Sequence, residues 1–124
     1  MNVAELNTQL RTLLSTELGV YSNGTPSIWV YGSASSPPSV SNGLECLIRQ
    51  NPIGYAGGSS AGQRYKPQQW EIILKNWKRD SNLIKAISKI EQRYCVMSLT
   101  HIPFSNEFIE QATIFIKDPI FINT

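Results

Sequence analysis

The run QWEIILKNW at residues 69–77 is the stretch that decides the fold of this chain. Its side chains alternate with a period of two, which is the period of a β-strand. One face of the strand carries Trp70, Ile72 and Leu74. The other face carries Glu71, Ile73, Lys75 and Trp77. Because the second face also holds large apolar residues, we expect both faces of this strand to contact something other than water.

Four further segments have the composition of strands, with β-branched, aromatic or alternating apolar residues. They are residues 28–31, 44–49, 95–99 and 112–117. In the second of these segments one face is formed by Leu44, Cys46 and Ile48. In the last one face is formed by Ala112, Ile114 and Ile116. The alternation predicts that each of these two strands buries that face.

Two other segments repeat apolar residues every three or four positions, which predicts two amphipathic helices. The first spans residues 3–18, ends at Gly19 and has an apolar stripe of Val3, Leu6, Leu10, Leu13, Leu14 and Leu18. The second begins after a cap at Asp80 or Ser81 and has a buried stripe of Leu83, Ile84, Ile87, Ile90 and Tyr94. Its water-facing side is expected to hold Lys85, Lys89, Glu91 and Arg93.

The order of helix, three strands, helix and two strands predicts one α+β domain over residues 1–124. Three consecutive strands favour an antiparallel meander, and each helix has one apolar face to bury. We therefore expect a two-layer sandwich in which a mostly antiparallel sheet of four or five strands carries both helices on one face. Residues 32–43 and 53–68 are predicted to be exposed loops. The opposite sheet face would then expose Leu47, Ile73, Trp77 and Phe115 as a protein interface.

The composition limits the classes of partner. A net charge of +2 with scattered Lys and Arg does not form the basic patch of a dedicated nucleic-acid binder. Only 16% of residues are charged, against roughly 25% in a typical soluble domain, which suggests that part of the surface is covered. The first residues lack a secretory pattern and there is no long apolar run, so we expect a soluble protein made in the cytosol, with no membrane partner.

The residues that could carry catalysis are few and dispersed. His101 is the single histidine and has no carboxylate close by in the sequence to orient it, so a structural or surface role is favoured. Cys46 and Cys95 lie in apolar runs and are interpreted as reduced core thiols, with a disulfide as the minority reading. A nucleophile made from either cysteine and His101 remains a remote alternative.

No cofactor or metal site is predicted. The glycines at residues 57–62 are spaced as in a phosphate-binding loop, but Gln63 and Arg64 replace the required Lys and Ser or Thr. The segment also leads into a strand, whereas a phosphate loop opens a helix. The carboxylates are too scattered for metal ligation. Basic and aromatic residues do mix at residues 64–66 and 70–79, where packing is favoured over binding of single-stranded nucleic acid.

The order of these features resembles the tail-terminator and neck proteins of long-tailed bacteriophages, including the minor tail proteins that close the tail tube. The features are the first helix, a strand entered through proline, GLECLI at residues 43–48, Asn51-Pro52, a Gly-rich loop, and WEIILKNW at residues 70–77 followed by a helix and a strand. The resemblance covers most of the chain. It rests on element order and on the pattern W-x-I-x-L followed by Asn-Trp, and on no catalytic signature.

The resemblance implies a structural protein of the virion tail or neck, made in the host cytoplasm and without enzymatic activity. It implies a homo-oligomer, a hexameric ring, that caps the tail tube and joins it to the connector or neck protein, with the sheath as a further candidate neighbour. DNA would only pass through the bore. Interface residues chosen by position are Tyr55, Arg64, Tyr65, Lys66 and Trp77. The alternatives are another neck, head-completion or connector protein and, remotely, a cysteine-dependent hydrolase.

Overall fold

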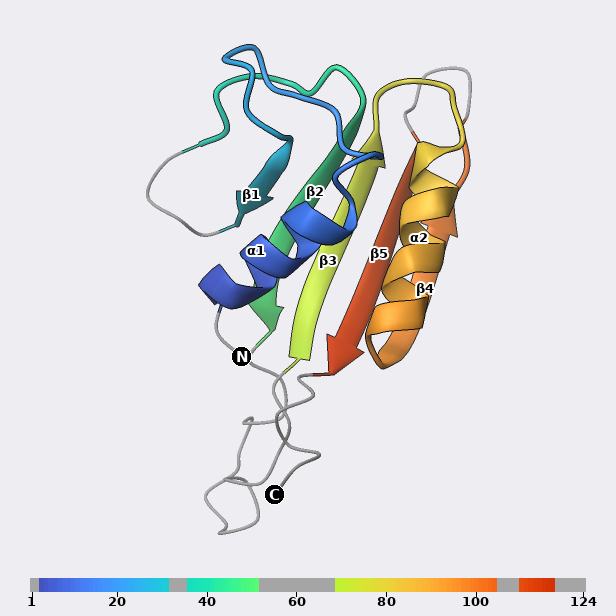
Figure 1. Cartoon of the computed structure of the whole chain (residues 1–124). Coiled ribbons are helices and arrows are strands. Elements are labelled where there is room, and N and C mark those ends of the chain that lie inside the picture. Colours follow the sequence, from blue (N-terminus) through green and yellow to red (C-terminus); the bar gives the residue numbers. More distant parts are fainter. Residues whose placement is uncertain (1–2, 32–35, 52–68, 105–109, 118–124) are drawn as a thin grey trace, which may run out of the picture.

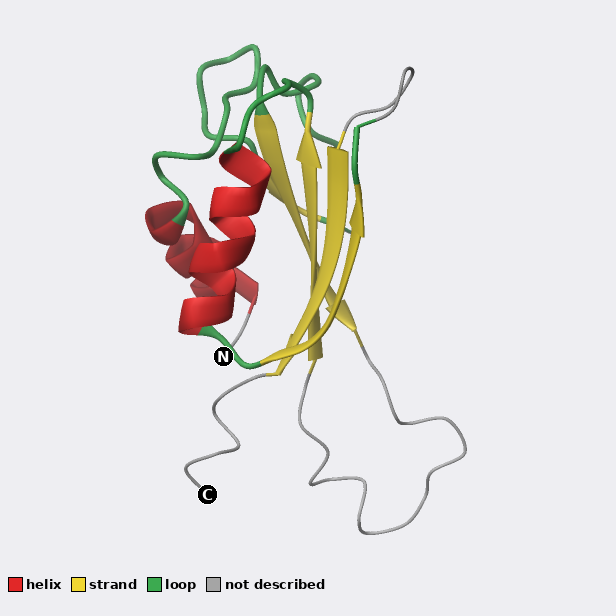
Figure 2. Cartoon of the chain, turned by 90° about the vertical axis from the view of Figure 1, so that its right-hand side faces the viewer, coloured by secondary structure: helices red, strands yellow, loops and turns green. Residues whose placement is uncertain are grey.

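A computed structural model describes residues 3–31, 36–51, 69–104 and 110–117 of the chain. Two helices and five strands follow one another in the order α1 (Val3–Leu13), β1 (Ile28–Val30), β2 (Leu44–Asn51), β3 (Gln69–Asn76), α2 (Asn82–Arg93), β4 (Val96–Ile102) and β5 (Glu110–Lys117). The strands form one sheet in the order β1-β2-β3-β5-β4 (Figure 1). Both helices lie on one face of the sheet, and Figure 2 shows the two layers edge-on. The predicted α+β sandwich with a mostly antiparallel sheet is confirmed.

The first pair of strands differs from the predicted meander. β1 runs parallel to β2, with Ile28 opposite Cys46 and Val30 opposite Ile48. A parallel neighbour requires a connection of about a dozen residues or more that returns the chain to its starting end. Residues 31–43 are long enough for such a connection, so the prediction that this pair belongs to an antiparallel meander was wrong.

The last of the described strands lies inside the sheet. β5 pairs antiparallel with β3 on one side and with β4 on the other. As a result β4, which precedes β5 in sequence, is an edge strand, and the short β1 is the other edge. Among the described residues, neither helix is long and apolar enough to cross a membrane.

The core lies between the helices and the inner face of the sheet. The predicted alternation is confirmed on the three central strands, whose fully buried inner residues are Leu44, Cys46, Ile48, Trp70, Ile72, Leu74, Ala112, Ile114 and Ile116. α1, the turn after it and α2 cover this surface with Leu6, Leu10, Leu14, Leu83, Ala86, Ile87 and Ile90. Each buried Leu or Ile side chain contributes about 1.5–3 kcal/mol through removal from water, so this layer is the main source of stability.

The first helix is shorter than its apolar stripe predicted. α1 ends at Leu13, and Leu14 to Glu17 continue as a turn. The chain then enters the sheet layer, because Gly19 N donates to Leu44 O at 2.9 Å. A Cβ at Gly19 would come within 2.7 Å of the Asn42 side chain and the Gly43 backbone. Glycine is therefore required here by close backbone approach.

The second helix follows its predicted pattern with one exception. Leu83, Ile87, Ile90 and Tyr94 are buried as expected, whereas Ile84 is half-exposed and Ala86 takes its place in the core. Ile84 stands to the side of the stripe formed by positions 83, 86, 87 and 90, so its predicted burial was wrong. The N-terminus is held by Asp80, whose Oδ1 accepts a hydrogen bond from Asn82 N at 3.0 Å. The Ser81 side chain makes no such bond.

An ion pair connects α2 to the turn that follows α1. The Lys89 ammonium on α2 lies 2.9 Å from Glu17 Oε1 and also donates to Thr16 Oγ1 at 3.2 Å and to Leu13 O at 3.4 Å. Lys89 thus binds a carbonyl at the C-terminal end of α1, where cations are favoured. Burial alone would raise the pKa of Glu17, but its hydrogen bonds to Lys89 and Thr16 and the Lys89 charge lower it overall. Lys89 therefore faces water only in part, since its side chain is 37% exposed.

We expect Lys89→Met to lower the free energy of unfolding by about 1–2 kcal/mol at neutral pH, because the buried Glu17 carboxylate loses its charged partner. A carboxyl pKa that is lowered on folding stabilises the protein above the ordinary value of 4.5, and this contribution disappears as the pH falls through the folded-state pKa. Urea denaturation between pH 7 and pH 3 should therefore show the two proteins converging at acid pH. Lys85→Met, at an exposed lysine of the same helix, is the control and should change little; equal losses in both variants would contradict the assignment.

Candidate assembly interface

The sheet face opposite the helices is the surface that the sequence predicted as an interface. On the three central strands it is built from Glu45, Leu47, Arg49, Glu71, Ile73, Lys75, Gln111, Thr113, Phe115 and Lys117. No helix lies over this face in Figure 2. Ile73 and Phe115 are half-buried by their neighbours. An ion pair between Arg49 and Glu71 crosses from β2 to β3.

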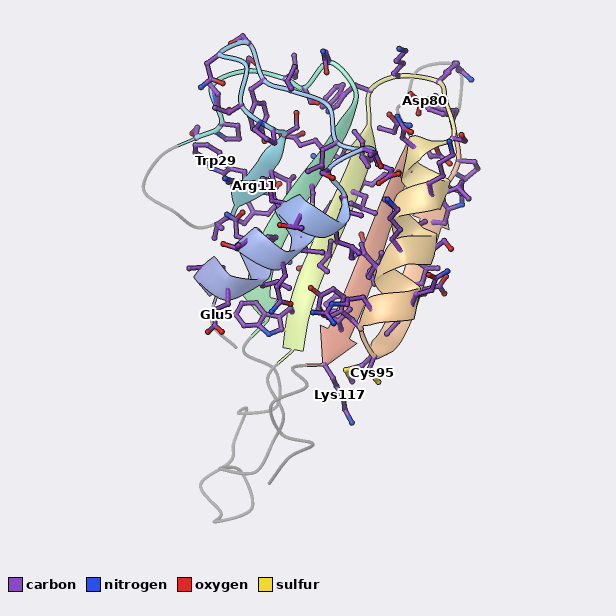
Figure 3. All side chains as sticks on the ribbon, in the orientation of Figure 1. Glu5, Arg11, Trp29, Asp80, Cys95 and Lys117 are labelled. Carbon is purple, nitrogen blue, oxygen red and sulfur yellow. The ribbon has the colours of Figure 1, made fainter. Side chains whose placement is uncertain are left out.

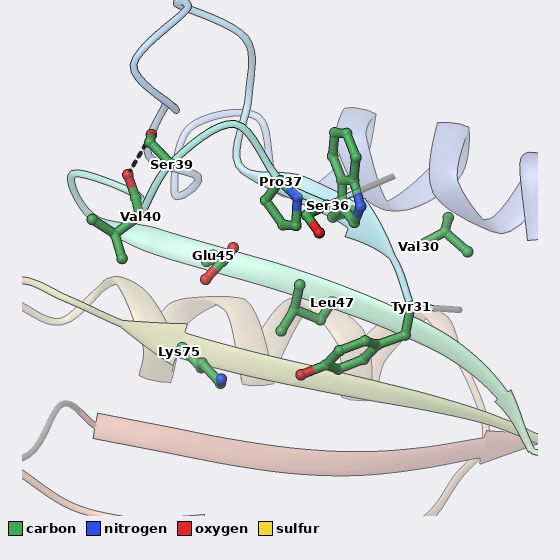
Figure 4. Close-up of a pocket in the computed structure, with 10 residues that line it drawn as sticks. Val30, Tyr31, Ser36, Pro37, Ser39, Val40, Glu45, Leu47 and Lys75 are labelled. Carbon is green, nitrogen blue, oxygen red and sulfur yellow. Dashed lines mark hydrogen bonds between the residues drawn. The ribbon is translucent and has the colours of Figure 1, made fainter. Parts of the chain in front are cut away.

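Leu47 is buried, whereas the sequence predicted that it would be exposed. It is only 4% exposed, although it lies on the helix-free face. Trp29 of β1 stands opposite it in the sheet, and residues 36–40 pass over the same region (Figure 4). The β1–β2 connection therefore covers one end of the face. Its residues are not all exposed as predicted, because Ser41 is buried and accepts a hydrogen bond from Ser27 Oγ at 2.6 Å.

A pocket of about 420 Å³ lies between this connection and the sheet. Its walls combine apolar and charged side chains from β1, β2, β3 and the connection: Trp29, Val30, Tyr31, Ser36, Pro37, Ser39, Val40, Glu45, Leu47 and Lys75. Figure 4 shows Glu45, Leu47 and Lys75 on its sheet side and Pro37 and Tyr31 beside them. Glu45 and Lys75 are opposite each other on β2 and β3, so the floor carries one charge of each sign.

The Glu45 carboxylate is buried and fully engaged. Its Oε2 accepts a hydrogen bond from Tyr21 OH at 2.8 Å, and its Oε1 accepts one from Trp77 Nε1 at 3.2 Å. Burial and then the hydrogen bond to Glu45 raise the pKa of the Tyr21 phenol well above its usual value. Tyr21 also packs edge-on against Trp29, with ring centroids 6.1 Å apart. Glu45 therefore joins the segment after α1 to β2 and to the end of β3.

Of the five interface residues chosen by position, Trp77 is the one that lies within the described part of the chain. It follows β3 on the helix-free face and is 41% exposed. Its indole is fixed by Glu45, and its backbone N donates to Gly43 O at 3.0 Å. A large aromatic ring held in one orientation and half-open to solvent is suited to protein contact. The other four predicted residues, Tyr55, Arg64, Tyr65 and Lys66, lie outside the described residues.

Within the described residues, a further exposed apolar segment was not predicted as an interface. Edge strand β4 exposes Met97 by 44%, Leu99 by 41% and Ile102 by 53%. Leu99 stands opposite Ile114 and Ile102 opposite Gln111, so the two side chains lie on different faces of the strand. The sequence of β4, VMSLTHI, contains no Lys, Arg, Asp or Glu and mixes apolar with polar side chains. Edge strands usually carry charges or proline that prevent pairing with other chains.

His101 has a partner that sequence proximity did not reveal. Its Nε2 lies 2.7 Å from Glu110 Oε2 on the neighbouring strand, nine residues away in the sequence. The pairing of His101 with Ala112 places Glu110 two residues along on the same face. The contact joins β4 to β5 near the end of the edge strand.

The two cysteines differ in environment. Cys46 is fully buried, and burial raises the pKa of its thiol to about 12. Cys95 is exposed, which corrects its prediction as a core thiol. Cys46 on β2 is separated from His101 on β4 by β3 and β5, roughly 14 Å at 4.8 Å per strand. Cys95 and His101 stand at opposite ends of β4, so this geometry argues against a Cys–His nucleophile.

Within the described ranges, no group of three or more His, Cys, Asp and Glu residues is placed to hold a metal ion. Comparison of the chain with family models, with curated proteins and with solved structures gave no match.

We expect Glu45→Ala to lower the free energy of unfolding by about 1–3 kcal/mol, because Tyr21 OH and Trp77 Nε1 would both lose their acceptor. Glu45→Gln should cost less, since its amide oxygen can still accept one of the two bonds. Urea titration followed by tryptophan fluorescence measures both. Glu91→Ala, at an exposed carboxylate of α2, serves as the control. If Glu45→Ala lowered the free energy of unfolding no more than this control does, Glu45 would not connect the segment after α1 to β2 and the end of β3.

Proposed function

We propose that this chain is a structural subunit that assembles with copies of itself, and that it works as a tail terminator of a long-tailed bacteriophage. In this role it forms a ring that caps the tail tube and joins it to the neck or connector. The observation that carries the assembly proposal is the uncharged edge strand β4 with its three exposed apolar side chains. The role in a phage tail rests on the resemblance of element order and of the segment at residues 70–77.

The helix-free face adds a second argument for assembly. It lies on the opposite side of the sheet from both helices and includes the half-exposed indole of Trp77. A ring subunit needs separate surfaces for its neighbours in the ring and for the structures above and below it. The edge strand and the helix-free face are distinct surfaces of this kind on one small domain.

A second candidate is another ring protein of the same neck, such as a connector or head-completion subunit. The same two surfaces would serve such a protein equally well. Co-sedimentation of the purified chain with isolated tails, compared with DNA-filled heads, separates the two roles, because a terminator binds the tail tube.

The proposal is tested by the mass of the purified full chain, measured by light scattering over a concentration series, alone and with purified tail tubes. We expect a hexamer of the 13.9 kDa chain, or a monomer that forms a ring on the tube ends and is visible there by negative-stain electron microscopy. A chain that stays monomeric at every concentration and ignores the tubes would overturn the proposal.

A further inference from the structure

β4 has a row of backbone groups that point away from the sheet. Lys117 N donates to Cys95 O at 3.0 Å, so the backbone N–H and C=O groups of Lys117 point toward β4. The same holds for every second residue before it in β5. The β4 residues opposite Phe115, Thr113 and Gln111 are Ser98, Thr100 and Ile102. These three therefore bond toward β5, and the N–H and C=O groups of Leu99 and His101 point outward.

The outward edge is both apolar and unpaired within the described part of the chain. No described strand lies beyond β4 in the sheet order. The register irregularity between Val96 and Ser98 affects only the first residues of the strand, so the part from Ser98 to Ile102 is left as a regular template. Apolar side chains flank this template on both faces, Leu99 on one and Ile102 on the other. A strand added here would gain main-chain hydrogen bonds and side-chain contacts together.

The chain itself contains a segment with matching chemistry. After Asp118 and Pro119 the sequence continues as Ile120, Phe121, Ile122, Asn123 and Thr124, which is uncharged and rich in β-branched and aromatic residues. In an extended conformation five residues span about 16 Å, which is enough to cover the regular part of β4. Such a strand would place Ile120 and Ile122 on one face and Phe121 on the other, as β4 does with its own apolar residues.

The same copy is poorly placed to use this segment on its own β4. Residue 118 follows Lys117, and Lys117 lies beside Cys95, where the chain passes from α2 into β4; Figure 3 shows these two side chains together at one end of the sheet. To reach the free edge, the segment would have to cross the α2–β4 connection at that end. Connections at the same end of a sheet rarely cross. A neighbouring copy can offer the segment without this crossing.

We propose that residues 120–124 of one copy add as a strand to the free edge of β4 in a second copy. This inference rests on the proposed function and deepens it by naming the contact between ring neighbours. Each copy then offers one donor segment and one acceptor edge, which is a heterologous contact and generates a ring when the rotation closes.

The test uses one acceptor variant and one donor variant of the full chain. Leu99→Pro removes an outward N–H without removing a β4–β5 hydrogen bond, since proline is tolerated on the open side of an edge strand. I120D/I122D places charge in the donor segment. Leu99→Ala, which keeps the N–H, is the matched control. Thermal melting identifies any variant that fails to fold, and Leu99→Lys then replaces Leu99→Pro as a charged block of the edge.

Under conditions in which the unaltered chain assembles, each blocked variant should fall to the 13.9 kDa monomer, while Leu99→Ala retains the oligomer. Mixing the two monomeric variants should give a dimer and nothing larger, because only the donor of one and the acceptor of the other remain intact. Light scattering measures the unaltered chain, the three variants and the mixture.

Oligomers that survive in either blocked variant would overturn the strand-addition contact and leave the proposed ring function standing. An oligomer that survives the donor variant alone would point to β4 pairing with β4. Two monomers that form no dimer on mixing would show that the segment does not act between copies. If the unaltered chain never assembles, the proposed function and this contact both fail.

Discussion

The burial of one face of β3 is the constraint on which the rest of the structure depends. β3 pairs along its whole length with β2 on one side and β5 on the other, and Trp70, Ile72 and Leu74 lie beneath the helices. A shift of one residue in either pairing would turn these three side chains to the opposite face. Keeping Trp70, Ile72 and Leu74 buried therefore fixes the register of β2 and β5, and with it the position of both helices. The helix-free face is the other side of this arrangement.

Local sequence patterns predicted the parts of the fold that depend on local chemistry. The period of two in residues 69–77 and 112–117 gave the inner faces correctly, and the period of 3.6 identified both helices. The parallel pairing of β1 with β2 and the place of β5 inside the sheet were not predicted, because both depend on the path of a connection through space. The predicted burial of Ile84 was wrong for a similar reason, because the width of the buried stripe on α2 depends on how the helix packs against the sheet.

The interface was predicted in part. Trp77 could be chosen because an aromatic residue on the second face of a half-buried strand stands out in a sequence. The contacts around Trp77 could not be predicted, because Glu45 lies 32 residues from Trp77 and meets it only through the β2–β3 pairing. Likewise His101 and Glu110 meet only through the β4–β5 register. The edge position of β4 was hidden because it depends on β5, which comes later in the chain.

The insertion of β5 between β3 and β4 has a consequence for biosynthesis. β4 leaves the ribosome before the strand that is to hold it, and its neighbour in the finished sheet arrives last among the elements described here. Until then β3 lacks one of its two partners and α2 has no complete surface to cover. Long-range pairings of this kind are slow to form. The nascent chain must therefore hold an incomplete core until translation has passed residue 117, and the sheet can close only after β5 has emerged.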